Sequence, residues 1–180
     1  VAGDGEEAIF SAIHTIGNYI DADDQHGGLF LTNASYEALP FPARHLVDVE
    51  SYHYTIDGVP ATSMIAQLGC PFACGFCGGR ETAMLRRIRT RSTESVVDEI
   101  EHLNEVYGVA GGMLYDDELN VNRQMGQLMH AIADLGEKRG VEFRLRGFIK
   151  SELFTEEQAI AIRRAGFRWI LVGFESGSPR

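Results

Sequence analysis

The sequence of 180 residues contains no run of about 18 apolar residues, which is the length that crosses a bilayer as a helix. Its N-terminus also lacks the order of basic, apolar and small residues that marks a secretory signal peptide. We therefore expect neither a membrane span nor a cleaved leader, no membrane partner, and a cytoplasmic location.

Positive charge is scarce as well. The sequence has 16 Lys and Arg residues against 26 Asp and Glu residues, which gives a formal net charge of −10. Such a balance argues against a broad phosphate-binding surface, so no nucleic-acid partner is predicted. One short stretch is rich in arginine and can still bind a local anion through Arg80, Arg86, Arg87, Arg89 and Arg91.

Cysteine is limited to three residues, Cys70, Cys74 and Cys77, with the spacing C-x₃-C-x₂-C. An odd number at short spacing argues against a disulfide framework, and clustered thiolates favour a soft metal centre such as zinc, copper(I) or an iron–sulfur cluster. Four thiolates would close a structural or electron-transfer site. Three leave one metal position open, which indicates chemistry at the centre.

Strand-like and helix-like patterns alternate from residue 62 onward. Strands are predicted at 62–68, 111–115, 142–148 and 169–174. The last of these is apolar on both faces, as expected of a buried parallel strand. Because a helix pattern separates each strand from the next, the order predicts an α/β fold with a parallel sheet and right-handed crossovers.

The predicted helices have recognisable ends. Ser92 or Thr93 can cap the first helix, and Gly108 suits the left-handed position after it. Thr155 and Gln158 have the spacing of a capping box for the third helix. The apolar stripe of the first helix is expected to be Val96, Val97, Ile100, Leu103 and Val106.

Polar residues follow each predicted strand. The cysteine loop follows the first strand, and the acids Asp116, Asp117 and Glu118 follow the second. Arg144 and Arg146 lie on or near the end of the third strand, and Glu175 and Ser176 follow the fourth. Ligands of parallel sheets and barrels bind at the carboxyl ends of the strands, so we expect these residues at one rim.

The cysteine loop, with Phe76 directly before its last cysteine and a strand before its first, resembles the signature of the radical SAM superfamily. The resemblance covers about residues 60–180. It implies that Cys70, Cys74 and Cys77 hold a four-iron four-sulfur cluster whose free iron binds S-adenosylmethionine. It also implies reductive cleavage to a 5′-deoxyadenosyl radical, an external electron donor such as flavodoxin or ferredoxin, and a small-molecule or peptide substrate.

The same resemblance implies a partial (βα)₆ barrel with about four βα units, and further residues that bind S-adenosylmethionine. Phe76 corresponds to the aromatic residue beside the adenine, and a core residue of the small loop is the alternative. One of Asp116, Asp117 and Glu118, which stand where many members have Gly-Gly-Glu, would receive the methionine ammonium. Which acid does so stays open, and all three can instead be solvated acids that cap the second helix.

Two other segments of the rim are candidates for the same cofactor. Glu175 and Ser176 resemble the family segment near the ribose and the methionyl group, although a simple turn after the strand is the alternative. Arg146, like Arg144, can face a carboxylate with two parallel hydrogen bonds. An arginine on a strand is also common in solvated ion pairs, so both interpretations stay open.

A narrower resemblance concerns the N-terminal part. Residues 3–7 and 39–44 look like the exit of a cobalamin-binding domain and the linker that follows it in cobalamin-dependent radical SAM enzymes, which transfer methyl groups or catalyse radical rearrangements. Residues 1–29 would then be the end of an upstream domain, 30–60 a linker, and 61–180 a radical SAM core truncated at its C-terminus. The chain has no Asp-x-His-x-x-Gly segment, so any cobalamin is expected in the upstream domain.

Two other functions compete with this interpretation. A structural zinc module would take His53 or His102 as its fourth ligand, although such modules do not need an α/β array behind the loop. A simple electron-transfer iron–sulfur protein would need a fourth cysteine, and the sequence has three.

Overall fold

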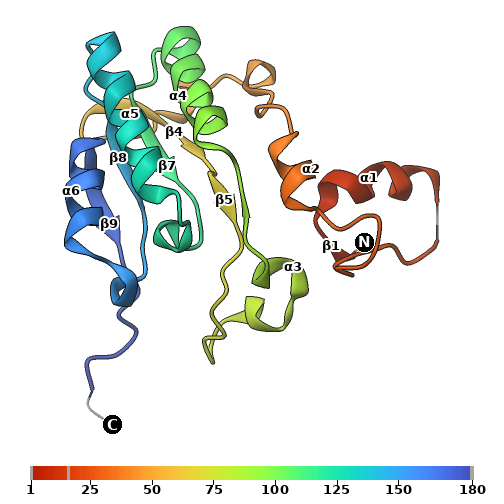
Figure 1. Cartoon of the computed structure of the whole chain (residues 1–180). Coiled ribbons are helices and arrows are strands. Elements are labelled where there is room, and N and C mark those ends of the chain that lie inside the picture. Colours follow the sequence, from red (N-terminus) through yellow and green to blue (C-terminus); the bar gives the residue numbers. More distant parts are fainter. Residues whose placement is uncertain (1, 16, 179–180) are drawn as a thin grey trace. The chain divides into compact units, whose positions relative to one another are not determined.

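The computed structural model describes residues 2–15 and 17–178, except for the side chains of residues 7 and 80 (Figure 1). The chain divides into two compact units. We name the first, Val1–Leu39 with Gln67–Arg91, the cysteine unit, and the second, Pro40–Ala66 with Ser92–Arg180, the barrel unit. Among the helices of the described residues, none has the length and apolar character that a bilayer crossing needs.

The barrel unit is built on a five-stranded sheet with the order β3-β4-β7-β8-β9. Its strands are β3 (Thr55–Ile56), β4 (Val59–Met64), β7 (Gly111–Leu114), β8 (Arg144–Phe148) and β9 (Phe167–Leu171). The last four pair in parallel, with Ser63 opposite Met113 and Met113 opposite Arg146, whereas β3 is antiparallel to β4. The sheet curls into half a barrel, which confirms the predicted α/β fold with a partial barrel.

Three helices pack on one face of this sheet: α4 (Thr93–Tyr107), α5 (Met125–Arg139) and α6 (Glu156–Arg164) (Figure 1). Their ends confirm the predicted caps. The Ser92 hydroxyl accepts from the Ser95 N–H, and Thr155 forms a capping box with Gln158. Gly108 follows α4 with φ of 64°, a left-handed conformation that glycine adopts without steric cost.

The two faces of the sheet bury different side chains. The face toward the helices buries Met64, Leu114, Leu145 and Phe167. Burial of each such side chain stabilises the fold by about 1.5–3 kcal/mol, so this face holds the unit together. On the opposite face, Ala61 and Met113 pack against Ile56 of β3. This second face is the inner face of the half barrel.

The first predicted strand was wrong in its bounds. β4 ends at Met64, and the next paired residues, β5 (Gln67–Leu68), belong to a separate ladder with β6 (Arg89–Thr90) in the cysteine unit. The reason is that the backbone groups of β5 pair with β6, which runs antiparallel to it. These residues therefore have their hydrogen-bond partners in β6 and do not continue the parallel sheet.

The last predicted strand was also wrong, because β9 spans Phe167–Leu171 and is not buried on both faces. Trp169 is 47% exposed and Ile170 is 38% exposed, since β9 is the edge strand of the described sheet. Val106 is 58% exposed as well and does not belong to the buried stripe of α4.

The cysteine unit combines short elements. They are β1 (Ala2–Gly3), α1 (Gly5–His14), β2 (Asp21–Ala22), α2 (Asn33–Glu37), β5, η3 (Gly78–Glu81), α3 (Ala83–Arg86) and β6. β1 and β2 pair in parallel.

In the barrel unit, the predicted linker contains the short turns η1 (Arg44–Leu46) and η2 (Glu50–Tyr52) as well as β3. Two further short turns, η4 (Leu119–Val121) and η5 (Ser151–Leu153), follow β7 and β8. The predicted domain boundaries stay predictions.

Candidate functional site

The three cysteines lie in the loop between β5 and η3, and none of them is in a disulfide. Cys70 and Cys74 are half-buried, and Cys77 is exposed. The N–H of Cys70 donates to the Leu85 carbonyl at 2.8 Å, which ties the start of the loop to α3. The N–H of Cys77 donates to the Cys74 carbonyl at 3.0 Å, so the C-x₂-C half of the motif is a closed turn.

Gly69 determines how the chain enters this loop. Its φ is +89°, a conformation that L side chains rarely adopt, and a Cβ at this position would overlap the Arg87 carbonyl oxygen. Glycine satisfies both requirements because it has no Cβ. Gly78, on the other side of the cysteines, has open space where its Cβ would be.

Two carboxylates from the N-terminal segment hold the chain that leaves the loop. Asp23 accepts hydrogen bonds from the N–H groups of Ala83 and Met84 at 3.2 and 2.6 Å and so caps α3. Arg89, whose side chain is 1% exposed, forms an ion pair with Asp4 and donates to the Met84 carbonyl at 2.9 Å. A buried guanidinium is tolerated only with such partners, so the N-terminal segment organises this side of the loop.

The three acids that follow β7 lie in different environments. Asp116 is fully buried, Asp117 is exposed, and Glu118 is half-buried. Burial raises the pKa of Glu118, the nearby charge of Lys150 opposes this shift, and Asp117 adds to it. Since a partly buried carboxylate is less screened by water, Glu118 can attract a bound cation more strongly than exposed Asp117 can.

Asn120 holds this loop against the loop that follows β8. Its side-chain amide donates to the Lys150 carbonyl at 2.9 Å and accepts from the Lys150 N–H at 2.9 Å. Asn120 is buried, so this reciprocal pair satisfies polar groups that water cannot reach. Sequence reasoning missed Asn120, because a single asparagine in a short turn has no spacing that marks it.

The residues after β9 form an exposed turn. Glu175 has a φ of 54°, and the Ser176 N–H donates to the Phe174 carbonyl at 2.5 Å. Glu175, Ser176 and, in the cysteine unit, Phe76 all have exposed side chains. Their predicted roles toward S-adenosylmethionine stay predictions.

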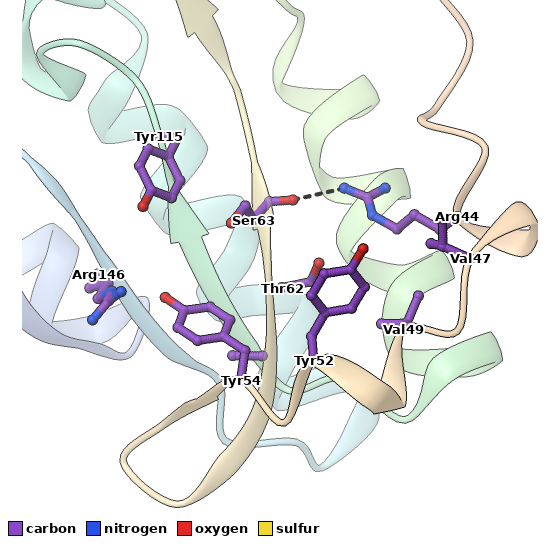
Figure 2. Close-up of a pocket in the computed structure, with 10 residues that line it drawn as sticks. Arg44, Val47, Val49, Tyr52, Tyr54, Thr62, Ser63, Tyr115 and Arg146 are labelled. Carbon is purple, nitrogen blue, oxygen red and sulfur yellow. Dashed lines mark hydrogen bonds between the residues drawn. The ribbon is translucent and has the colours of Figure 1, made fainter.

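A cavity of about 470 Å³ opens on the inner face of the half barrel (Figure 2). Its walls come from β4, β8, the residue after β7, and the segment 44–54. The Arg146 guanidinium lies 5.2 Å from the centre of the Tyr54 ring, and its Nε donates to the Met113 sulfur at 3.2 Å. Arg146 therefore faces the middle of the inner face.

The other arginine of β8, Arg144, has a different role. Arg144 forms ion pairs with Glu142 at 2.6 Å and with Asp57, in the turn between β3 and β4, at 3.3 Å. Arg168 contacts the same two carboxylates. These contacts raise the pKa of Arg144 and lower the pKa of Glu142. Arg144 thus belongs to a structural ion-pair network at the start of β8.

The segment 44–54 is fastened to the barrel unit by Arg44. Its guanidinium donates to Glu99 of α4 at 2.7 Å and to the Ser63 carbonyl of β4 at 2.8 Å, a bond drawn in Figure 2. Glu99 is only 1% exposed. Sequence reasoning treated this segment as a linker and missed the wall it forms. The alternation of Tyr52 and Tyr54 just before a strand was the available signal.

A comparison with known families now adds to this geometry. The family model described as the Radical SAM superfamily matches residues 64–180, which is more than half of the sequence. The chain belongs to the radical SAM superfamily. This membership confirms the resemblance seen at the cysteine loop, and the superfamily implies a four-iron four-sulfur cluster and S-adenosylmethionine as cofactors.

Two curated proteins have similar sequences. The uncharacterized methyltransferase PH0819 of Pyrococcus horikoshii is 27% identical over 147 residues, which cover 80% of this chain and 30% of that protein. The anaerobic magnesium-protoporphyrin IX monomethyl ester cyclase of Cereibacter sphaeroides is 30% identical over 138 residues, which cover 69% of this chain and 22% of that protein.

Solved structures of radical SAM proteins are similar as well. The methyltransferase TsrM from Kitasatospora setae, with a tryptophan substrate and a SAM analogue bound, has a TM-score of 0.63 and 27% identity over 74% of this chain and 25% of its own. The cobalamin-dependent enzyme OxsB, at 19% identity and a TM-score of 0.54 over 65% of this chain and 18% of its own, shows the fold alone. This chain thus spans less than a third of each relative.

The donor set of the cysteine loop fits the cluster that a radical SAM protein uses. Three free thiols in one loop are the ligands that iron–sulfur clusters take. In the described residues, no three His, Cys, Asp or Glu side chains form a group that could hold a metal ion. The ligand assignment therefore depends on the donor set and its spacing.

Proposed function

We propose that the protein containing this chain cleaves S-adenosylmethionine reductively and transfers a methyl group with the help of cobalamin. The observation that carries the first part is the C-x₃-C-x₂-C loop of three free thiols inside a radical SAM sequence. When bound, the cluster would supply the electron that splits a carbon–sulfur bond of S-adenosylmethionine.

In this proposal, each part of the chain has a separate task. Cys70, Cys74 and Cys77 hold the cluster. Gly69 lets the start of the loop pack against the Arg87 carbonyl, where a Cβ would not fit. Of the three acids after β7, we assign the methionine ammonium to Glu118. It is half-buried, whereas Asp116 is fully buried and Asp117 is exposed. A carboxylate and an ammonium form a charge-assisted hydrogen bond, which is among the stronger kinds.

Methyl transfer is supported by relatives. PH0819 is named a methyltransferase, as is the cytidylyl-2-hydroxyethylphosphonate methyltransferase of Streptomyces wedmorensis, which is 29% identical over 54% of this chain. TsrM is a methyltransferase with cobalamin and a four-iron cluster bound in its structure. The cyclase of Cereibacter sphaeroides bears a different name, so methyl transfer needs its own test.

The test is anaerobic turnover of the reconstituted full-length protein with dithionite and S-adenosylmethionine, with and without methylcobalamin. Radical cleavage predicts 5′-deoxyadenosine, and methyl transfer predicts S-adenosylhomocysteine that depends on cobalamin. Replacing Cys77 with Ser should abolish both products, while Ala73→Ser, a polar change in the same loop that keeps all three thiols, should leave them. A colourless protein with one tightly bound zinc would refute the proposal in favour of the zinc module.

Glu118 has a matched control in its neighbour. Glu118→Gln should raise the KM for S-adenosylmethionine by about 10-fold or more, as expected when a hydrogen bond to a charged group is lost. Asp117→Asn removes the same charge from an exposed side chain and should change the KM by less than about 2-fold. Equal effects of the two variants would show that Glu118 has no special contact.

A further inference from the structure

The cavity of the barrel unit contains one charge that the described residues do not neutralise. Two arginines line it, and Arg44 is paired with the buried carboxylate of Glu99 at 2.7 Å. Arg146 takes part in none of the ion pairs found among residues 2–15 and 17–178. Its partners there are neutral: the Tyr54 ring and the Met113 sulfur. A half-buried guanidinium with such surroundings can still bind an anion.

The phenol beside Arg146 shows the same lack of a complete partner. Within the described residues, the buried Tyr54 hydroxyl makes no hydrogen bond of good geometry, although the Arg146 guanidinium is close enough to lower its pKa. Burial outweighs this effect, so the pKa of Tyr54 is raised overall. Tyr54 therefore stays protonated at neutral pH, and its hydroxyl can donate. Figure 2 shows this hydroxyl pointing toward Arg146.

The rest of the wall is mainly apolar. Val47, Val49 and Ala61 line the cavity together with the rings of Tyr52 and Tyr54. The volume of about 470 Å³ lies in the range of pockets that hold small organic molecules. An occupant therefore needs an apolar body for the walls and one anionic group for the single guanidinium that has no carboxylate partner.

We propose that this cavity binds the carboxylate group of a small apolar substrate, with Arg146 as its anchor and the Tyr54 hydroxyl as a second donor. A carboxylate fits better than a phosphate monoester, because one guanidinium balances one negative charge and a dianion would leave a charge uncompensated away from water. This inference rests on the proposed function in one respect, which is that the occupant is the substrate of the radical reaction.

The test uses four simple probes with the full-length reconstituted protein under anaerobic conditions. 3-Phenylpropionate has both features, 3-phenylpropionamide lacks the charge, acetate lacks the apolar body, and inorganic phosphate tests the other anion. Calorimetric titration should show that the acid binds at least about 10-fold more tightly than the amide, the usual effect of a charge-assisted hydrogen bond. The acid should also bind more tightly than acetate and phosphate.

The ratio of acid to amide affinity within each variant is the decisive readout, because partial loss of folded protein affects both probes alike. Arg146→Gln should bring this ratio close to one, and Arg146→Lys should keep part of it. Arg163→Gln, which removes the same charge from an exposed position on α6, should leave it unchanged. A ratio near one in the unmodified protein, an unchanged ratio in Arg146→Gln, or tighter binding of phosphate would overturn the proposal.

A competition experiment separates substrate from cofactor. If S-adenosylmethionine does not displace 3-phenylpropionate, the cavity is distinct from the cofactor site, as we propose. If it displaces the probe completely, Arg146 belongs to the cofactor, as the sequence resemblance implied, and the substrate assignment fails. Formation of 5′-deoxyadenosine is measured in parallel. Its presence without probe binding rejects the cavity proposal alone, and its absence with intact probe binding rejects the proposed function alone.

Discussion

Gly69→Ala is the change that most directly tests how the cysteine loop is held. The added Cβ would sit on a backbone with φ of +89° and overlap the Arg87 carbonyl oxygen, which lies on the chain that enters β6. We expect the variant to lose cluster binding, because the start of the loop and β6 must move apart to make room.

The magnitude follows from two contributions. A left-handed backbone costs a residue with a Cβ about 1–2 kcal/mol. Relief of a steric overlap in a packed site costs about 1–3 kcal/mol more. The sum of about 2–5 kcal/mol predicts a fall in melting temperature of at least about 4 °C for a unit of about 150–250 residues.

Two glycines provide matched controls. Gly78 has open space at its Cβ position and lies on the other side of the cysteines, so Gly78→Ala should retain iron and stability. Gly108 has a φ of +64° and also has open space, so Gly108→Ala should show the backbone contribution without the overlap. Iron and sulfide content, absorbance near 400 nm and thermal unfolding are measured for all three. Iron content in Gly69→Ala equal to that in Gly78→Ala would refute this explanation.

Two further predictions concern the barrel unit. Glu99→Gln should cost about 3–5 kcal/mol in the free energy of urea unfolding, because Arg44 loses its buried counter-charge. Asp98→Asn on the exposed side of α4 should cost little, and equal costs would refute the buried pair. For Glu118, the raised pKa stabilises the folded state at a pH below the ordinary carboxyl pKa, and this contribution is lost as the pH rises through the raised value. The free energy of urea unfolding of the unmodified protein should therefore fall relative to that of Glu118→Gln as the pH rises through this range, and a difference that does not change with pH would contradict the raised pKa.

Local signals predicted much of the barrel unit. The caps at Ser92 and Thr155 and the left-handed Gly108 depend on residues within four positions of each other, which the sequence displays directly. The parallel sheet followed from the alternation of strands and helices, whereas its curling into a partial barrel was implied by the family resemblance. The exposure of Trp169 could not be foreseen in this way, because it depends on what lies beside β9.

The site was predictable where chemistry is concentrated in one motif and not where it depends on distant partners. The cysteines are close in sequence, so their spacing revealed them. Arg146 was expected among the polar residues at the ends of the strands, whereas the structure places it beside Tyr54, a residue 92 positions earlier in the sequence. The pair of Arg44 and Glu99 likewise joins two segments that no local pattern connects.

The contacts of Arg89 have a practical consequence for dissecting this protein. The family match begins at residue 64, which suggests a truncated protein that starts there as a minimal core. Such a truncation would remove Asp4 and the Leu31 carbonyl and leave the buried guanidinium of Arg89 with fewer acceptors. It would also uncap α3 by removing Asp23. Fragments made for cluster reconstitution should therefore keep the first 31 residues of the chain.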